Sequence, residues 1–176
     1  MKNSFCFLVA TLIMGMPLTV VAQSHSHDHT SPYVGHTDRE IKALSAEEIA
    51  GLLNGDGLGM ALPAELNQYP GPLHVLKLGQ MLDLSDEQES QIQAIFQAMK
   101  EQARSLGQKI VEQERYLDQS FAESTVTETS LGELLEAIAQ SRAELRATHL
   151  RAHLRVLPIL TEAQREHYEK ARGYAK

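Results

Sequence analysis

The apolar positions between residues 85 and 156 recur with the spacing of two long amphipathic helices. In the first helix, successive apolar residues are three, four or seven positions apart. The members of this stripe are Ile92, Ile95, Met99, Ala103, Leu106, Ile110, Leu117 and Phe121. An α-helix has about 3.6 residues per turn, so this spacing predicts one continuous helix with a single apolar face. The polar residues 123–130 are expected to end it.

A second apolar stripe follows this polar break. The pair Ser130 and Glu133 predicts a capping box at the start of the next helix, and Pro158 predicts its end. Because the break is short, the two long helices are expected to lie antiparallel as a hairpin. The members of the second stripe are Leu134, Ile138, Leu145, His149, Ala152 and Val156.

Shorter helices are expected on either side of the hairpin. Capping boxes predict helices over residues 46–53 and 162–172, and the apolar pattern predicts another over 73–82. Residues 54–72 contain many Gly and Pro and are expected to be mostly loop. The sequence contains no strand pattern. The expected fold is therefore all-α, a long antiparallel helical hairpin with short flanking helices.

The first residues have the features of a cleaved export signal. Lys2 precedes the apolar run Phe5–Met16, and small residues precede Gln23. The run is too short for a membrane anchor. We therefore expect export to the periplasm, with no membrane insertion after cleavage. The expected organisation is a signal peptide at 1–22, a disordered His-rich tail at 23–37, a short helix and Gly/Pro-rich loops at 38–72, and the helical-hairpin domain at 73–176.

Composition excludes several kinds of site and partner. The net charge of -7 argues against nucleic acid as a partner, because nucleic acids favour basic surfaces. The single cysteine, Cys6, lies inside the expected signal, so a disulfide framework is excluded. The Gly-rich stretch 55–60 lacks the third Gly of a dinucleotide loop, and no organic cofactor is expected.

A five-residue pattern occurs twice and brackets the predicted hairpin. Each copy is a Leu, a hydroxyl residue and a Gln three positions after the hydroxyl, which is the arrangement of a capping box. The two copies comprise Leu84, Ser85 and Gln88, and Leu160, Thr161 and Gln164. This repeat resembles the paired LTxxQ motifs of the periplasmic Spy/CpxP family, which includes heavy-metal-resistance and sensor members of the ZraP and CnrX type.

The resemblance implies a four-helix hairpin fold, a homodimer, no enzymatic activity and one of two functions. Metal-binding relatives sense or buffer transition metals, and a membrane-bound signalling protein is then the expected partner. Spy- and CpxP-like relatives are ATP-independent chaperones that bind unfolded or misfolded client proteins in envelope stress. The resemblance covers about residues 73–172.

Histidines favour the metal-binding function. His149 and His153 are one helical turn apart, a spacing that chelates Zn, Ni, Co or Cu. Leu150 stands where a zinc protease needs its catalytic Glu, so no enzyme is expected. His74 is expected to dock near this pair, and Met99 is a weaker candidate ligand. The alternative is a partly exposed His pair on an Arg-rich face.

The expected tail offers a second metal site. Cleavage before Gln23 would give a free amine followed by Ser24 and His25, which can surround Cu(II) or Ni(II) in a square plane. His27 and His29 would add weaker ligands, and the alternative is a polar spacer. We therefore expect a periplasmic protein that binds a divalent transition metal, with chaperone activity as the alternative.

Overall fold

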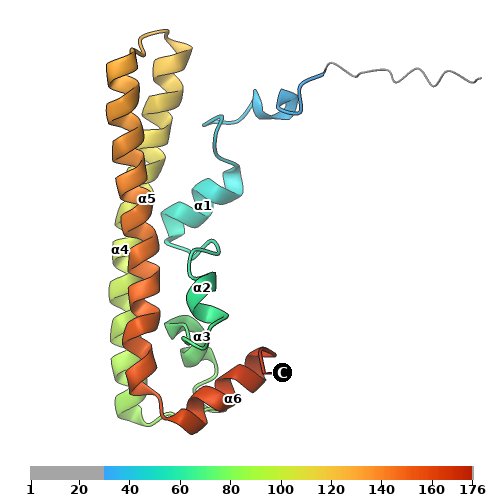
Figure 1. Ribbon diagram of the computed structural model, residues 1–176, viewed down its shortest axis with the longest axis vertical. Helices are drawn as coiled ribbons and strands as arrows, with labels where there is room; N and C mark the ends of the chain where they lie inside the picture. The colour runs from blue at the N-terminus through green and yellow to red at the C-terminus, as the bar shows by residue number, and fades with distance from the viewer. Residues whose placement is uncertain (1–29, 176) are drawn as a thin grey trace, which may run out of the picture. The chain divides into compact units, whose positions relative to one another are not determined.

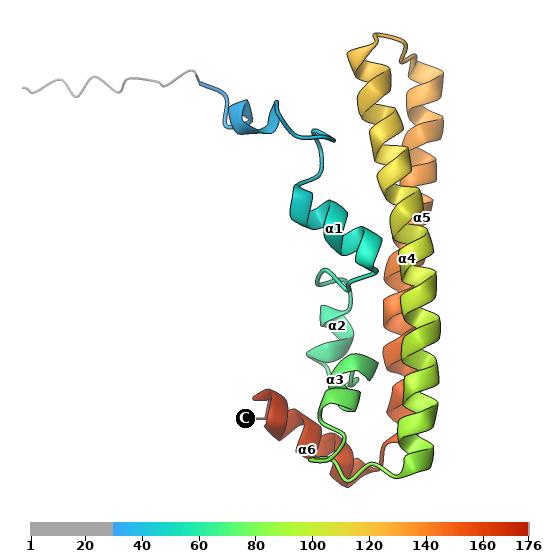
Figure 2. The same cartoon turned by 180° about the vertical axis from the view of Figure 1, so that it is seen from behind.

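The computed structural model describes residues 30–175, and residues 33–175 belong to one compact unit. All regular secondary structure in this described part is helical. Two long antiparallel helices, α4 (Asp86–Ala122) and α5 (Glu128–Val156), lie side by side, and the shorter helices cover one side of them (Figures 1 and 2). The expected all-α hairpin is confirmed. No helix among residues 30–175 is long and apolar enough to cross a membrane.

The start of α4 follows from its first capping box, as expected. The Ser85 hydroxyl accepts from the Gln88 N–H at 3.2 Å, and the Gln88 side chain accepts from the Ser85 N–H at 3.0 Å. This pair of bonds satisfies backbone donors that the helix itself leaves free.

The expected start of α5 was wrong by three residues. Thr127, rather than Ser130, is the N-cap; its hydroxyl accepts from the Ser130 N–H at 3.2 Å, and the Ser130 hydroxyl accepts from the Thr127 N–H at 2.9 Å. A Ser at the third helical position thus replaces the usual Glu or Gln. Phe121, the last member of the predicted apolar stripe, is 56% exposed at the end of α4.

The three short helices that were expected are present, together with three further short elements. They are the 3-10 helix η1 (Val34–His36), α1 (Ala46–Asn54), α2 (Leu62–Glu65), α3 (Pro72–Lys77), the 3-10 helix η2 (Leu157–Ile159) and α6 (Glu162–Arg172). Helix α3 is shorter than the expected 73–82, because a turn closes where the Leu84 N–H donates to Gly79 O at 3.1 Å and Asp83 has a φ of 47°. Within the expected disordered tail, the structure describes residues 30–37, which include η1.

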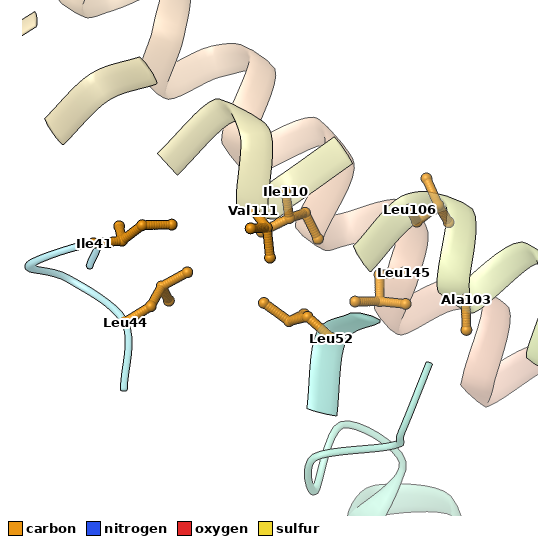
Figure 3. Close-up of a cluster of buried hydrophobic side chains, with 8 residues drawn as sticks. All are labelled: Ile41, Leu44, Leu52, Ala103, Leu106, Ile110, Val111 and Leu145. Carbon is orange, nitrogen blue, oxygen red and sulfur yellow. The ribbon is translucent and has the colours of Figure 1, made fainter. Parts of the chain in front are cut away.

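One apolar cluster fixes α1 and the segment before it onto the hairpin (Figure 3). Leu52 of α1 approaches α4 at Gly107, where a Cβ would collide with the Leu52 carbonyl group. Only a glycine allows this contact. The buried members of the cluster, here called the leucine cluster, are Ile41, Leu44, Leu52, Ala103, Leu106, Ile110, Val111 and Leu145.

The two copies of the repeated motif meet beside a second apolar cluster and are joined by side-chain hydrogen bonds. The side-chain amides of Gln88 and Gln164 exchange two hydrogen bonds of 2.9 and 3.0 Å, and Gln88 also donates to Ile159 O at 2.8 Å. Each glutamine therefore caps its own helix and binds the other helix start. The buried members of this cluster are Val75, Leu82, Ile92, Val156, Leu160 and Tyr168.

Candidate functional site

A cavity of about 300 Å³ lies between the hairpin and the chain that covers it. All four metal-ligand candidates of the folded part line it: His74, Met99, His149 and His153. Helix α3 contributes the first, α4 the second and α5 the other two. Residues far apart in the sequence thus meet at one place, although their meeting does not by itself make a metal site.

His149 and His153 lie on the buried face of α5. They are only 4% and 7% exposed, so the alternative of a partly exposed pair on an Arg-rich face is wrong. The helical register explains this, because His149 continues the stripe of Leu145 and Ala152 that packs against the covering chain.

The hydrogen bonding of His153 determines which ring nitrogen is available. Its Nδ1 lies 2.7 Å from the carbonyl oxygen of Tyr69, which can only accept, so Nδ1 carries the proton. In the neutral ring, Nε2 then has the free lone pair. This nitrogen faces the backbone of Gly71, where a Cβ would lie 3.2 Å from it. Metal-binding imidazoles in proteins are commonly oriented by such a carbonyl.

His149 has a different environment. Its Nε2 is buried and makes no hydrogen bond to any described residue. Burial lowers the pKa of His149, and the charges of His153 and Lys100 lower it further. The ring is therefore neutral at neutral pH, the form in which an imidazole can be a metal ligand.

A carboxylate that the sequence analysis missed occupies the same cavity. Glu65, at the end of α2, is 6% exposed. Its Oε1 accepts hydrogen bonds from Tyr168 (2.6 Å), Arg172 (3.2 Å) and Tyr174 (3.3 Å). Its Oε2 lies 3.8 Å from His153 Nδ1 and has no hydrogen bond within residues 30–175.

The protonation of Glu65 follows from these contacts. Burial raises its pKa, but the Tyr168 hydrogen bond and the charges of His74, His153 and Arg172 outweigh burial and lower it. Burial and the same carboxylate raise the pKa of Tyr168, which stays a donor. The carboxylate is thus ionised and is the centre of contacts that join α2 to α6.

His74 is engaged with this carboxylate. Its Nδ1 lies 3.3 Å from Glu65 Oε1, and its side chain is 37% exposed. Burial lowers its pKa, as does the charge of Arg172, although Glu65 acts in the opposite direction. His74 is therefore beside the predicted site but turned toward α2.

No local pattern could have pointed to Glu65, which lies in the Gly/Pro-rich stretch without helical periodicity. The only available hint was in α6, where Tyr168 and Arg172 lie one turn apart on one face and require a shared acceptor if buried. Across the cavity, Asp56 and Lys100 form a second ion pair of 2.8 Å that the sequence also did not indicate.

The metal-ligating side chains of the cavity do not form a complete metal centre on their own. In the part of the chain that the structure describes, no group of three or more His, Cys, Asp or Glu side chains is arranged to hold a metal ion. The residues that line the cavity include the His149 and His153 imidazoles, the Met99 thioether and the Glu65 carboxylate, whose Oε2 has no hydrogen bond among the described residues. The expected tail site of Gln23, Ser24, His25, His27 and His29, and the expected signal at 1–22, lie outside the described residues.

Comparison with known proteins found one family. A family model described as "LTXXQ motif family protein" matches residues 73–172, more than half of the 176-residue chain. The match includes both copies of the repeated motif and the whole hairpin. Neither the comparison with curated proteins nor that with solved structures found a match.

Proposed function

The chain belongs to the LTXXQ motif family, and from this premise we propose that it is a metal-binding member, holding a transition metal ion at the cavity between α3, α4 and α5. Proteins of this family are typically periplasmic and of Spy/CpxP type, and they are generally non-enzymatic. The metal function is the specific part of the proposal, and it depends on His149 and His153.

One observation carries the proposal: two buried imidazoles one turn apart each have a nitrogen without a protein partner among the described residues. The buried His149 Nε2 makes no hydrogen bond there, and the Nδ1 of His153 is bound to Tyr69 O, so Nε2 is the ring nitrogen of His153 that a ligand could use. Burying such groups is unfavourable unless something satisfies them. A metal ion bound by both nitrogens would do so.

The proposal favours one kind of metal because of a further donor in the cavity. Met99 lines the same cavity, and a thioether is a soft ligand that favours copper over the harder divalent ions. Two imidazoles alone would also accept Zn, Ni or Co. His74 could join this set only by leaving Glu65, so we place it outside the primary ligands.

Calorimetric titration with copper, zinc, nickel and cobalt tests the proposal. The full-length protein should carry His25→Ala, His27→Ala and His29→Ala, which removes the imidazoles of the expected tail site. We expect His149→Ala/His153→Ala to weaken binding at least about a hundredfold, the scale of losing two ligands. The matched control is His167→Ala, an exposed imidazole on α6 outside the cavity.

Two outcomes would contradict the metal function. One is that no ion binds to the protein with the altered tail; the other is that the double variant binds as tightly as its parent. Circular dichroism of each variant establishes that the helices are retained.

A second candidate function is chaperone activity, favoured by exposed apolar side chains on the chain that covers the hairpin. Leu58, Leu62, Leu66 and Leu73 are each 40% exposed or more. Such side chains can bind apolar segments of unfolded clients. Suppressed aggregation of a denatured client, lost when Leu62 and Leu66 are changed to Ser, would support this function in place of the metal function.

A further inference from the structure

The net negative charge of the chain is concentrated at one end of the hairpin. Residues 112–139, which surround the turn between α4 and α5, contain seven Asp or Glu and a single Arg. They account for six of the seven net negative charges of the chain, so the remaining residues are nearly neutral together. A local excess of one sign attracts partners of the opposite sign.

Most of the acidic side chains at this end have no positive partner. Glu114 pairs with Arg142 at 2.7 Å, and Asp118 pairs with Lys42 at 3.6 Å. The other five are exposed and form no ion pair within residues 30–175; they are Glu112, Glu123, Glu128, Glu133 and Glu136. These five charges are available to a binding partner.

Helix α4 has an exposed apolar residue on the side that the covering chain protects further along. The N–H of Lys42, ahead of α1, donates to Asp118 at 3.2 Å. Phe121 lies three residues after Asp118 and therefore on the same side of α4. It is 56% exposed, and this end of the hairpin projects beyond α1 (Figures 1 and 2). The covered side of α4 thus continues here as exposed apolar surface.

Helix α5 adds a second apolar side chain to this side. Leu135 lies about two turns before Arg142, whose guanidinium pairs with Glu114. Glu114 is one turn before Asp118, so these contacts share one side of α4. Leu135 is 50% exposed. The surface here called the hairpin-end face comprises Phe121, Leu135 and the exposed carboxylates Glu128 and Glu136.

We propose that the hairpin-end face binds a basic amphipathic helix of a partner protein. Helix α1 already packs on the adjacent part of α4 through its apolar residues, so this side of the hairpin accepts a helix. The apolar side of the partner helix covers Phe121 and Leu135, and its Lys or Arg side chains pair with Glu128 and Glu136. Two copies of this chain cannot pair end to end favourably, because both ends are acidic.

This partner function goes beyond the proposed metal function and needs no ion, so it is tested in chelator-treated buffer. The probes are two labelled synthetic helical peptides, each with Leu at every third or fourth position. One has Lys at the other positions, and the second has Glu there. Fluorescence anisotropy with the full-length protein should show that the Lys peptide binds at least about tenfold more tightly, because like charges repel.

Apolar variants locate the binding surface. Phe121→Ser/Leu135→Ser should weaken binding of the Lys peptide at least about tenfold, because two large apolar side chains are no longer buried by the peptide. The matched control is Tyr116→Ser. Tyr116 is 61% exposed at the same end of α4 but lies two residues from Asp118, on the opposite side of the helix. Tyr116→Ser should leave binding unchanged, and circular dichroism establishes that each variant keeps its helices.

Charge variants test the acidic part of the face. Glu128→Gln/Glu136→Gln should weaken binding of the Lys peptide at least about threefold, the scale of losing two exposed ion pairs. Glu87→Gln/Glu89→Gln removes the same charge at the far end of α4, where both side chains are exposed, and should leave binding unchanged.

The proposal is overturned if the Lys peptide does not bind, if both peptides bind equally, or if Phe121→Ser/Leu135→Ser binds as tightly as the parent. Self-association of the full-length protein that is lost in this same variant, measured by analytical ultracentrifugation, would also overturn it, since a second copy would then cover the face. The separate metal titration shows independently whether the metal function holds.

Discussion

Helix α1, which contributes to the leucine cluster, and helices α2 and α3, which line the cavity, lie on the same side of the hairpin (Figures 1 and 2), yet the chain covers the two regions differently. At the leucine cluster, α1 packs directly on α4, and the buried side chains are apolar. At the cavity, α2 and α3 leave a space of about 300 Å³ into which buried polar residues reach. The first region stabilises the fold, whereas the second has groups that require a partner.

Helix α5 contributes to both regions, and its buried face changes from apolar to polar side chains within one turn. Leu145 of α5 belongs to the leucine cluster, while His149 and His153, the next positions on that face, line the cavity. Burial of Leu145 is favourable in itself, because the hydrophobic effect needs no specific partner. Burial of an imidazole is favourable only when its nitrogens are bound. The binding role proposed for His149 and His153 would offset this cost.

The largest expected effect is at the close contact of the leucine cluster. Gly107→Val places a Cβ against the Leu52 carbonyl, so α1 must move away from α4. We expect a loss of about 3 kcal/mol or more in the free energy of unfolding, measured in urea. Gly132→Val, in open space on α5, is the control. An equal loss in both variants would show that helix propensity, not the close contact, is responsible.

The next largest effect is expected at Glu65, in the cavity. Glu65→Ala leaves the Tyr168 hydroxyl and the Arg172 guanidinium without their shared acceptor. We expect a loss of about 2 to 3 kcal/mol, since removing one partner leaves buried donors unpaired. The measurement is urea unfolding, with Glu112→Ala on the exposed side of α4 as control. An unfolding free energy equal to that of the parent would mean that this carboxylate does not hold α6.

A smaller effect is expected where the two motif copies meet. Gln88→Ala removes the reciprocal amide pair with Gln164 and the bond to Ile159 O. We expect a loss of about 1 to 2 kcal/mol, the range of a cap together with side-chain hydrogen bonds. Gln97→Ala, exposed in the same helix, should change the thermal midpoint little. Similar midpoints for the two variants would argue against a structural role of the motif pair.

The smallest expected effect is a change in how stability depends on pH. The pKa of His149 is lowered from 6.5 in the folded protein, so below about pH 6.5 the unfolded chain binds more protons than the native one. Stability should therefore fall as the pH drops through this window. His149→Gln should reduce that slope, and His167→Gln should not, as measured by urea unfolding at several pH values. A slope unchanged by His149→Gln would show that the ring is not held neutral by burial.

Glu65 also makes the stability fall as the pH drops, but in a lower pH range. Its pKa lies below 4.5 in the folded protein, so its contribution is present above pH 4.5 and is lost as the pH falls through the folded pKa. The leucine cluster has no titratable side chain among its buried members. The part of the acid sensitivity that comes from His149 and Glu65 should therefore arise at the cavity and not at the leucine cluster.

The sequence by itself determined the hairpin, most helix starts and the repeated motif. These features are local: an apolar stripe of helical period and a hydroxyl three residues before a Gln act within one or two turns. At Thr127 and Ser130 the local rule has two solutions, and the predicted cap, Ser130, is wrong. Both residues can cap, and only the three-dimensional bonds distinguish them.

Only the tertiary structure decided what the polar residues do. His74, Met99, His149 and His153 were identified from the sequence, but their common cavity arises from contacts between distant helices. Glu65 could not be foreseen, because its partners Tyr168 and Arg172 lie more than a hundred residues away and no local pattern encodes that distance. Capping bonds and helical periodicity depend on residues close together in the sequence, so the sequence predicts them. A buried charge and its partners come together only when the chain folds.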